Sequence, residues 1–191
     1  MSEELEFYEY PQQLLDLGNF HAGGLILDVG GGGEGVIGRL FGPRVVAIDL
    51  RRDELEETPP GPLKIVMDAR ELQFLDGSFD NATAFFALMY LSSRAEQLRV
   101  LQEVRRVLRP GGKLYLWEVA LWPRPHTALP CYVVNLRVRL PQEEFGTGYG
   151  QRWPAEPCDE TYYRALADQA GFSLLAAERH AHLFHLVLGK G

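Results

Sequence analysis

Cysteine and long apolar runs are scarce in this chain. Only Cys131 and Cys158 occur among 191 residues, too few for a disulfide framework and without the spacing of a zinc site. No segment approaches the roughly 18 uninterrupted apolar residues of a membrane helix. The acidic start, MSEELEFYEY, is unlike a signal peptide. We therefore expect a cytoplasmic protein with no metal site and no membrane partner.

Positive charge is also in deficit. The chain has 19 Lys and Arg against 26 Asp and Glu, which gives a formal net charge of -7. Because nucleic-acid affinity depends on neutralisation of phosphates by Lys and Arg, we expect no nucleic-acid partner. Internal repeats are absent, and a chain of 191 residues, 46% of them hydrophobic, fits a single domain over residues 1–191.

Compact apolar runs alternate with helical segments in the first two thirds of the chain. Runs of this kind are typical of strands that are buried on both faces of a parallel sheet. The alternation predicts an α/β fold with a Rossmann-like doubly wound sheet, mostly parallel with an antiparallel closing strand, in three α/β/α layers. Ligands are expected at the carboxyl ends of the strands. The expected strands lie in residues 24–30, 44–50, 64–69, 79–91 and 113–119.

The last third of the sequence has a different pattern. Residues 131–140 alternate like a half-buried strand, and residues 143–153 are expected to be a loop or a returning strand. Asp159 is the expected N-cap of a helix. Residues 173–190 predict two closing strands, on which His180, His182 and His185 are expected to face solvent because their spacing does not suit a metal site.

A glycine-rich segment, LDVGGGGEGVIG, joins the first expected strand to the helix that follows. Glycine permits positive φ and lets the backbone approach a ligand closely. Gly30, Gly32 and Gly35 fit the pattern G-x-G-x-x-G, and Asp49 lies 19 residues after Gly30, where a ribose-binding acid belongs. On these residues alone, an NAD(P)-binding oxidoreductase is one interpretation.

Three consecutive strands are expected to end near carboxylates. Asp28 precedes the glycines and is expected to point to the mouth of the loop. There it would disfavour a pyrophosphate by on the order of 4 kcal/mol at about 4 Å and an effective dielectric of about 20. A ligand with sulfonium and ammonium groups would be favoured instead; the alternative is that Asp28 only caps loop amides. Asp49 can accept two ribose hydroxyls, each bond contributing about 1.5–3 kcal/mol. Asp68 can accept an exocyclic amino group.

Together these segments resemble the class I S-adenosylmethionine-dependent methyltransferases, in particular the small-molecule group related to ubiquinone and menaquinone methylases. The likeness covers roughly residues 24–119, including EVRRVLRPGGKLYLWE and LQFLDGSFDNATAFFALMYL, which resembles the family's passage from its third helix into its fourth strand. It implies the cofactor S-adenosyl-L-methionine, with the methionine part at the glycine loop, the ribose at Asp49 and the adenine at Asp68. The implied cofactor-binding residues are Asp28, Gly30, Gly31, Gly32, Asp49, Leu50, Asp68, Ala69 and Phe85.

The sequence departs from the family at three places. Glu34 occupies the family's third glycine position, the helix between Asp28 and Asp49 is short, and Met89 and Tyr90 stand where many relatives have a His pair. We therefore assign no catalytic residue. Transfer of a methyl group from a sulfonium is an in-line displacement, so alignment can supply most of the acceleration, and a general base matters only if the acceptor must lose a proton early.

Aromatic side chains are frequent where the family places its acceptor-binding insertion, here residues 120–153. This segment is expected to be either a lid over a small-molecule acceptor or a hairpin that packs in the core. Near the start, Phe7, Tyr8 and Tyr10 are expected on a packing helix or over the cofactor. The predicted function is methyl transfer to a small molecule; the alternative of a non-catalytic S-adenosylmethionine-binding module stays open, as does the oligomeric state.

Overall fold

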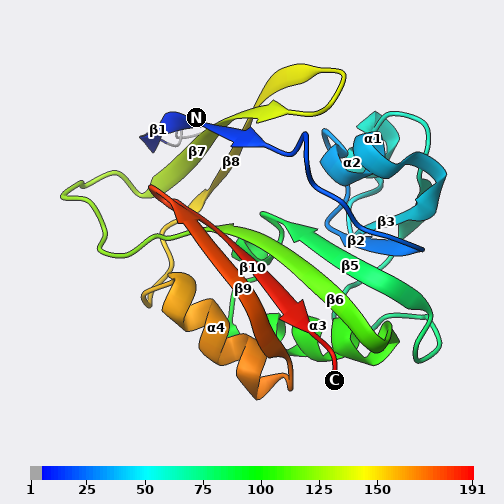
Figure 1. Cartoon of the computed structure of the whole chain (residues 1–191). Coiled ribbons are helices and arrows are strands. Elements are labelled where there is room, and N and C mark those ends of the chain that lie inside the picture. Colours follow the sequence, from blue (N-terminus) through cyan, green and yellow to red (C-terminus); the bar gives the residue numbers. More distant parts are fainter. Residues whose placement is uncertain (1–5) are drawn as a thin grey trace.

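A seven-stranded sheet forms the centre of the computed structural model, which describes residues 6–191 (Figure 1). Neighbouring strands are parallel from β4 to β6, and β10 runs antiparallel to both of its neighbours. The predicted sheet with one antiparallel closing strand is therefore confirmed. In spatial order the strands are β4 (Leu63–Val66), β3 (Val45–Asp49), β2 (Ile26–Val29), β5 (Phe79–Phe85), β6 (Leu108–Val119), β10 (Leu183–Gly189) and β9 (Ser173–His180).

Helices cover both faces of this sheet (Figure 1). One face carries α1 (Val36–Phe41) and α2 (Arg52–Glu57), and the other carries α3 (Arg94–Val107) and α4 (Glu160–Gln169). The central strands β2 and β3 are almost wholly buried, as their continuous apolar sequence predicts. Short 3-10 turns occur at η1 (Gly42–Arg44) and η2 (Leu88–Tyr90).

The N-caps of α3 and α4 follow from their sequences. Ser93 accepts a hydrogen bond from the N–H of Glu96 at 3.2 Å, and Glu96 in turn accepts from the two preceding serine hydroxyls. Asp159 accepts from the N–H of Tyr162 at 3.0 Å, as predicted.

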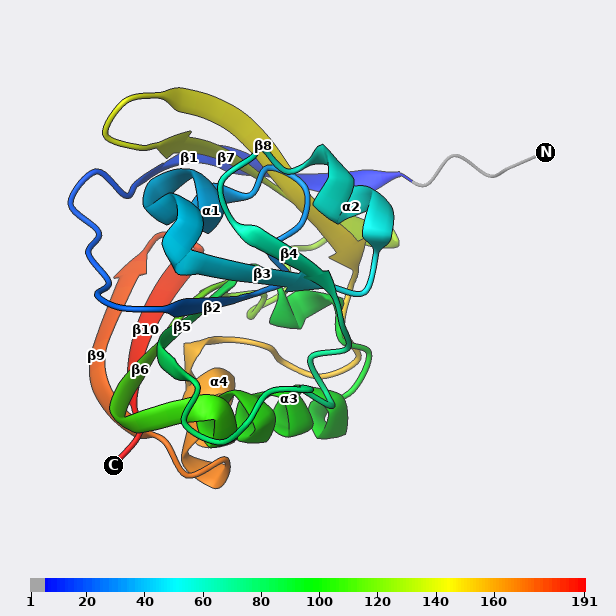
Figure 2. The same ribbon diagram turned by 90° about the vertical axis from the view of Figure 1, so that its right-hand side faces the viewer.

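A second, three-stranded sheet lies beside α1 and α2 on the same side of the large sheet (Figures 1 and 2). It consists of β1 (Phe7–Asp16), β7 (Cys131–Arg139) and β8 (Glu144–Arg152), with β7 in the middle. Alternate residues of β7 are buried in a cluster that includes Trp117 and Val119 of the large sheet. The segment 120–153 therefore contributes to the core through β7.

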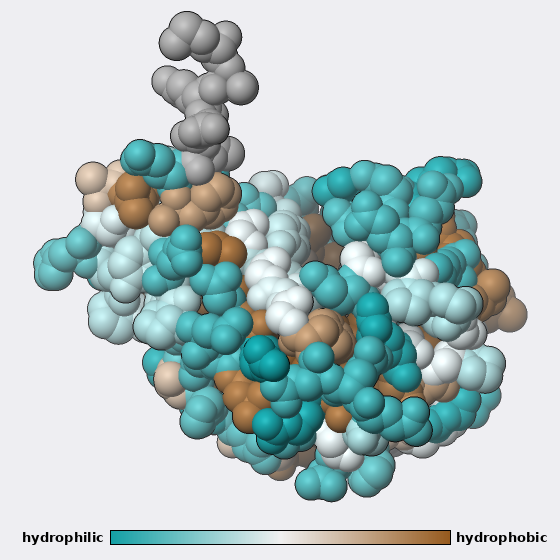
Figure 3. All heavy atoms as spheres, turned by 90° about the horizontal axis from the view of Figure 1, so that it is seen from above, coloured by the Kyte–Doolittle hydropathy of each residue, from teal (hydrophilic) through white to brown (hydrophobic). Residues whose placement is uncertain are grey.

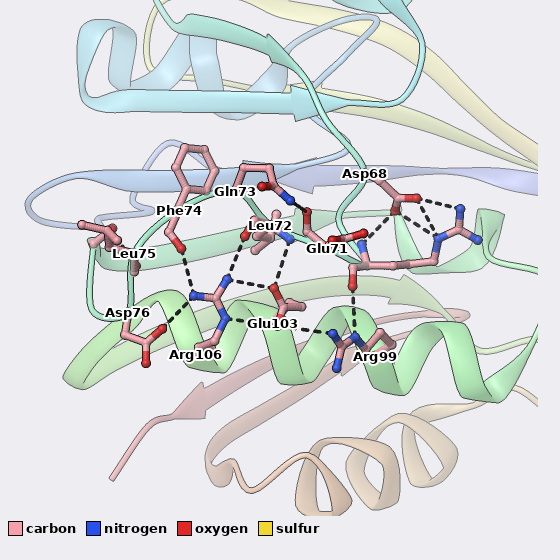
Figure 4. A network of polar contacts seen from close by, with 12 residues as sticks. Asp68, Glu71, Leu72, Gln73, Phe74, Leu75, Asp76, Arg99, Glu103 and Arg106 are labelled. Atoms are coloured by element: carbon pink, nitrogen blue, oxygen red, sulfur yellow. Dashed lines mark hydrogen bonds and ion pairs between the residues drawn. The ribbon is translucent and has the colours of Figure 1, made fainter.

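Two expected helices are absent from the described residues. The segment with Phe7, Tyr8 and Tyr10 is a strand, because it pairs in parallel with β7, a partner far away in the sequence. Residues 72–78, which begin the stretch that resembles the family's passage from its third helix into its fourth strand, form bends and turns. Their backbone groups bind side chains of α3 instead: Glu103 accepts the N–H of Leu72, and Arg106 donates to backbone carbonyls of the same segment (Figure 4).

Two of the three C-terminal histidines differ from the prediction. His180 is exposed, but the ring of His182 lies tilted against Tyr10 with centroids 4.5 Å apart, and His185 stacks on Trp117 at 4.3 Å. The Nε2 atoms of His182 and His185 are buried without a hydrogen-bond partner. The expectation that all three face solvent is therefore wrong for two of them. The rings pack between the two sheets, an arrangement that strand periodicity does not reveal.

Within residues 6–191, no helix is both long and apolar enough to cross a membrane. The same residues bring together no cluster of His, Cys, Asp and Glu side chains that would hold a metal ion. Residues 1–5, which carry the acidic start of the chain, lie outside the described part.

Candidate functional site

A cavity of about 670 Å³ lies at the carboxyl ends of β2, β3 and β5. This is the edge at which a doubly wound sheet places its ligands. Seen from above, the face over α1, α2 and the small sheet is mainly hydrophilic, with hydrophobic side chains between the polar ones (Figure 3). The predicted cofactor residues that line the cavity are Gly30, Gly32, Asp49, Leu50, Asp68, Ala69 and Phe85.

The glycine loop is packed too closely to accept side chains. A Cβ added to Gly32 would lie 2.6 Å from Cβ of Glu54 and 2.9 Å from Oδ2 of Asp49. Gly30 adopts φ 69°, in the left-handed region that favours glycine, and a Cβ there would meet Ala87 at 2.7 Å. The backbone of Gly30 and Gly32 therefore forms part of the cavity wall directly.

Asp28 and Gly31 do not line the cavity. Asp28 is only 2% exposed, and its carboxyl accepts a hydrogen bond from Oγ1 of Thr83 at 2.7 Å. Oδ2 of Asp28 lies beneath Gly31, 2.6 Å from where a Cβ of that glycine would stand. The expectation that Asp28 points to the loop mouth is therefore wrong. Burial raises the pKa of Asp28 to about 7, with a smaller upward contribution from the charge of Asp49.

The other two predicted acids do reach the cavity. Asp49, half-buried at the end of β3, accepts the N–H of Arg51 at 2.9 Å and lies beside the exposed Leu50. Asp68 is held by Arg70, whose Nη2 lies 2.7 Å from Oδ2 and which also pairs with Glu96. The hydrogen bond from Arg70 lowers the pKa of Asp68. Both side chains therefore lie at one edge of the sheet, and both carboxylate oxygens of Asp68 already accept from Arg70.

Aromatic side chains form the opposite wall. Phe85, Phe86 and Tyr90 come from the end of β5 and the turn after it, and Tyr149 comes from β8. The rings of Phe86 and Tyr149 stack, with centroids 4.9 Å apart. Phe86 has φ 53°, a strained conformation for a residue with a side chain, and such strain often accompanies functional sites. The sequence pointed to Tyr149 as aromatic in the insertion but did not identify Phe86.

Residues 27–116 match the family model described as a methyltransferase domain. A ubiquinone/menaquinone biosynthesis C-methyltransferase of Pseudomonas putida is 33% identical over 118 residues, covering 54% of this chain and 45% of that protein. A phosphatidylethanolamine N-methyltransferase of Cereibacter sphaeroides is 34% identical over 105 residues, covering 49% of this chain and 50% of that protein. The solved structure of an amino pentose methyltransferase from Micromonospora echinaspora, with SAM bound, aligns with a TM-score of 0.59 at 22% identity, covering 88% and 84%.

The resemblance to the class I methyltransferases is confirmed. The chain spans about half the length of the curated relatives it matches. Residues 27–116, which match the methyltransferase family model and are called the matched region below, contain every predicted cofactor residue. Gly148 and Tyr149, which complete the cavity, lie outside it on β8.

Three contacts fasten β8 and the residues just before it to the glycine loop and α1 of the matched region. Oγ1 of Thr147 donates to Oε1 of Glu34 at 2.5 Å. Nη1 of Arg39 lies 3.1 Å from Oε2 of Glu143, and the Arg39 guanidinium lies 4.8 Å from the ring centroid of Phe145. We call these five residues the loop clasp. Glu34, noted in the sequence only as a departure from the family's glycine, thus connects the loop to the small sheet.

Proposed function

We propose that this chain is an S-adenosylmethionine-dependent methyltransferase acting on a small-molecule acceptor. The observation that carries the proposal is the meeting of the glycine loop, Asp49 and Asp68 around one cavity in a methyltransferase domain. Asp49 would accept the ribose hydroxyls, Asp68 with Ala69 would contact the adenine, and the backbone of Gly30 and Gly32 would hold the methionine part.

The residues present fit this cofactor. A Cβ does not fit at Gly32, so the polar backbone of this residue lies directly beside the carboxylate of Asp49. When bound, the cofactor supplies an electrophilic methyl group on a sulfonium. The protein then needs to align the acceptor with that methyl group and to exclude water, because the leaving thioether needs no proton. Phe86, Tyr90 and Tyr149 would exclude water beside the acceptor.

The charge of the cavity wall disfavours a dinucleotide. Acidic residues outnumber basic ones among the residues that line it: Glu34, Asp49, Glu54, Glu57 and Asp68 against Arg39 and Arg51. A pyrophosphate would meet these like charges, whereas a sulfonium and an ammonium would be attracted by them. We therefore favour the methyltransferase over an NAD(P)-binding oxidoreductase.

Thermal unfolding with candidate ligands tests the cofactor. A ligand at 100 times its dissociation constant adds about 2.7 kcal/mol to the free energy of unfolding, a shift that is easily measured. We expect stabilisation by S-adenosylmethionine and S-adenosylhomocysteine and none by NAD or NADP. Stabilisation by NAD or NADP alone would overturn the proposal.

A transfer assay with labelled methyl groups separates catalysis from binding. The names of the relatives include both carbon and nitrogen methylation, so the acceptor panel should contain nucleophiles of both kinds. Label transferred to a small molecule supports the enzyme. Tight cofactor binding with no transfer across the panel would favour a non-catalytic module that binds S-adenosylmethionine.

A further inference from the structure

Glu118 is a buried carboxyl group that the proposed reaction does not use. It lies near the end of β6 and is 0% exposed. Its Oε1 accepts the N–H groups of Leu88 at 2.8 Å and Met89 at 3.2 Å, while its Oε2 is buried with no partner. Buried polar atoms without a partner are rare and costly, so a group of this kind calls for an explanation.

The turn held by Glu118 is part of the cavity wall. It follows β5 and the strained Phe86, and it brings Ala87, Leu88 and Tyr90 to the cavity. A second contact comes from below, where Nε2 of Gln97 donates to the carbonyl of Leu88 at 3.0 Å. Glu118, which does not itself line the cavity, thus supplies two of the hydrogen bonds that fix this wall.

We propose that Glu118 is a positioning residue: its carboxylate holds the Leu88–Met89 turn against the cavity, and a cationic ligand in the cavity strengthens that hold. The inference rests on the proposed function, because S-adenosylmethionine is the cation considered. Hydrogen bonds to an ionised acceptor are roughly twice as strong as those to a neutral one. Binding and ordering of the turn are therefore coupled.

The protonation of Glu118 supports this coupling. Burial raises the pKa of Glu118 to about 8, and the amides of Met89 and Leu88 lower it less strongly. Near neutral pH the carboxyl group of the ligand-free protein is therefore mostly protonated. A positive charge nearby favours the carboxylate, so uptake of a cation is expected to release a proton and to be tighter at higher pH.

The other titratable groups around Glu118 ionise at higher pH. They are Tyr90 of η2, Tyr132 of β7, Cys158 before α4 and Tyr163 of α4, and the charge of Glu118 contributes to the raised pKa of each. Burial is the main cause in every case, and it brings the pKa of Tyr90 to about 12 and that of Cys158 to about 11. Asp28, beneath the glycine loop, is the other buried acid that titrates near neutral pH.

The test is the affinity for S-adenosylmethionine between about pH 6.5 and 9, measured for the wild type and for Glu118→Gln. Glutamine keeps a carbonyl that accepts the two amides but cannot ionise. Because the ligand's own amino group titrates in this range, the informative quantity is the affinity of the wild type divided by that of E118Q at each pH. We expect this ratio to rise about three- to tenfold with pH, the factor of ten corresponding to one pKa unit.

The matched control is Glu103→Gln. Glu103 is also largely buried and accepts a backbone N–H, that of Leu72 at 3.0 Å, but it does not line or support the cavity wall. We expect the ratio of wild-type to E103Q affinity to stay constant with pH. A constant ratio for E118Q, or an equal rise for E103Q, overturns the inference.

A measurement on the Asp28→Asn variant keeps the test independent of whether E118Q folds. Calorimetric titration with S-adenosylmethionine near pH 7, where the ligand's amino group is already mostly protonated, counts the protons released on binding when it is repeated in buffers of different ionisation enthalpy. Release in D28N supports Glu118 as the source, and binding without release overturns the inference while leaving the proposed function intact. If wild type binds neither S-adenosylmethionine nor S-adenosylhomocysteine at any pH, both proposals fall.

Discussion

At the scale of single residues, the cavity depends on Asp49 and Gly32. Oδ2 of Asp49 lies only 2.9 Å from where a Cβ of Gly32 would stand, so the acid and the loop backbone form one continuous surface. A ligand that bridges a ribose and an amino acid chain would contact both. A change at either position is therefore expected to weaken binding.

Asp49→Ala should weaken the binding of S-adenosylmethionine at least tenfold, because it removes two charge-assisted acceptors worth about 1.5–3 kcal/mol each. The melting temperature should change little, since Asp49 lies half-buried at a strand end. Asp53→Ala is the control: Asp53 is nearby and pairs with Arg51, but does not line the cavity. Isothermal titration showing equal affinity for D49A and wild type would contradict the ribose assignment.

Gly32→Ala should lower cofactor affinity about tenfold and destabilise the fold by about 1–3 kcal/mol, the usual cost of overpacking. The added methyl group would lie 2.6 Å from Cβ of Glu54, so the loop or α2 must shift. Gly23→Ala is the control, because nothing lies within 4 Å of its added Cβ. Titration and chemical denaturation of both variants measure the effects; equal behaviour of G32A and G23A would show that the loop adapts without loss.

At the scale of elements, the loop clasp joins the matched region, residues 27–116, to the small sheet. The ion pair of Arg39 and Glu143 has partly exposed side chains, so it contributes no more than about 1 kcal/mol. The bond from Thr147 to Glu34 reaches the glycine loop itself. The clasp therefore limits how far β8 can move from the cavity.

Thr147→Val should raise the dissociation rate of S-adenosylmethionine a few-fold. The variant loses one hydrogen bond to a charged group, which is worth at most about 1.5–3 kcal/mol, and only part of that energy acts on ligand exit. Valine keeps the shape and removes only the hydroxyl. Thr127→Val, in the connection before β7, is the control. Stopped-flow displacement measures both rates, and equal rates for T147V and wild type would indicate that the clasp does not limit ligand exit.

At the scale of the whole molecule, histidines packed between the two sheets link stability to acid pH. Burial lowers the pKa of His185 and of His182. The unfolded chain therefore binds more protons than the folded one below about pH 6.5, so the free energy of unfolding falls as the pH drops through that range. Asp28 and Glu118, whose pKa values are raised, act in the opposite direction between about pH 4 and 8.

His185→Phe should reduce the fall in the free energy of unfolding at acid pH, which we call the acid limb of stability. Phenylalanine can retain the stacking on Trp117 and does not titrate. Chemical denaturation between about pH 5 and 7 should show a smaller loss of unfolding free energy for H185F than for wild type. His180→Phe, at an exposed position, should leave the acid limb unchanged. An acid limb of H185F identical to that of wild type would assign the effect to other groups.

Much of the large sheet was predictable because its strands are buried on both faces. The runs that end at Val29 and Asp49 and the amphipathic helix α3 follow the periodicities of their sequences. The glycine loop and two of the three strand-end acids were also placed at the cavity. Asp28 was not, because alternation along a strand gives the face on which a side chain lies but not whether the next loop folds over it.

The sequence by itself determined the five parallel strands of the large sheet, the glycine loop, the acid at the end of β3 and the acid just after β4, since these depend on local periodicity and on backbone chemistry. Only the tertiary structure decided that β1 pairs with β7, that Glu34 binds Thr147 and that Glu118 lies beneath the turn of Leu88 and Met89. The physical reason is that these contacts join segments far apart in the chain. Their partners are selected by packing of the whole molecule, which no local pattern records.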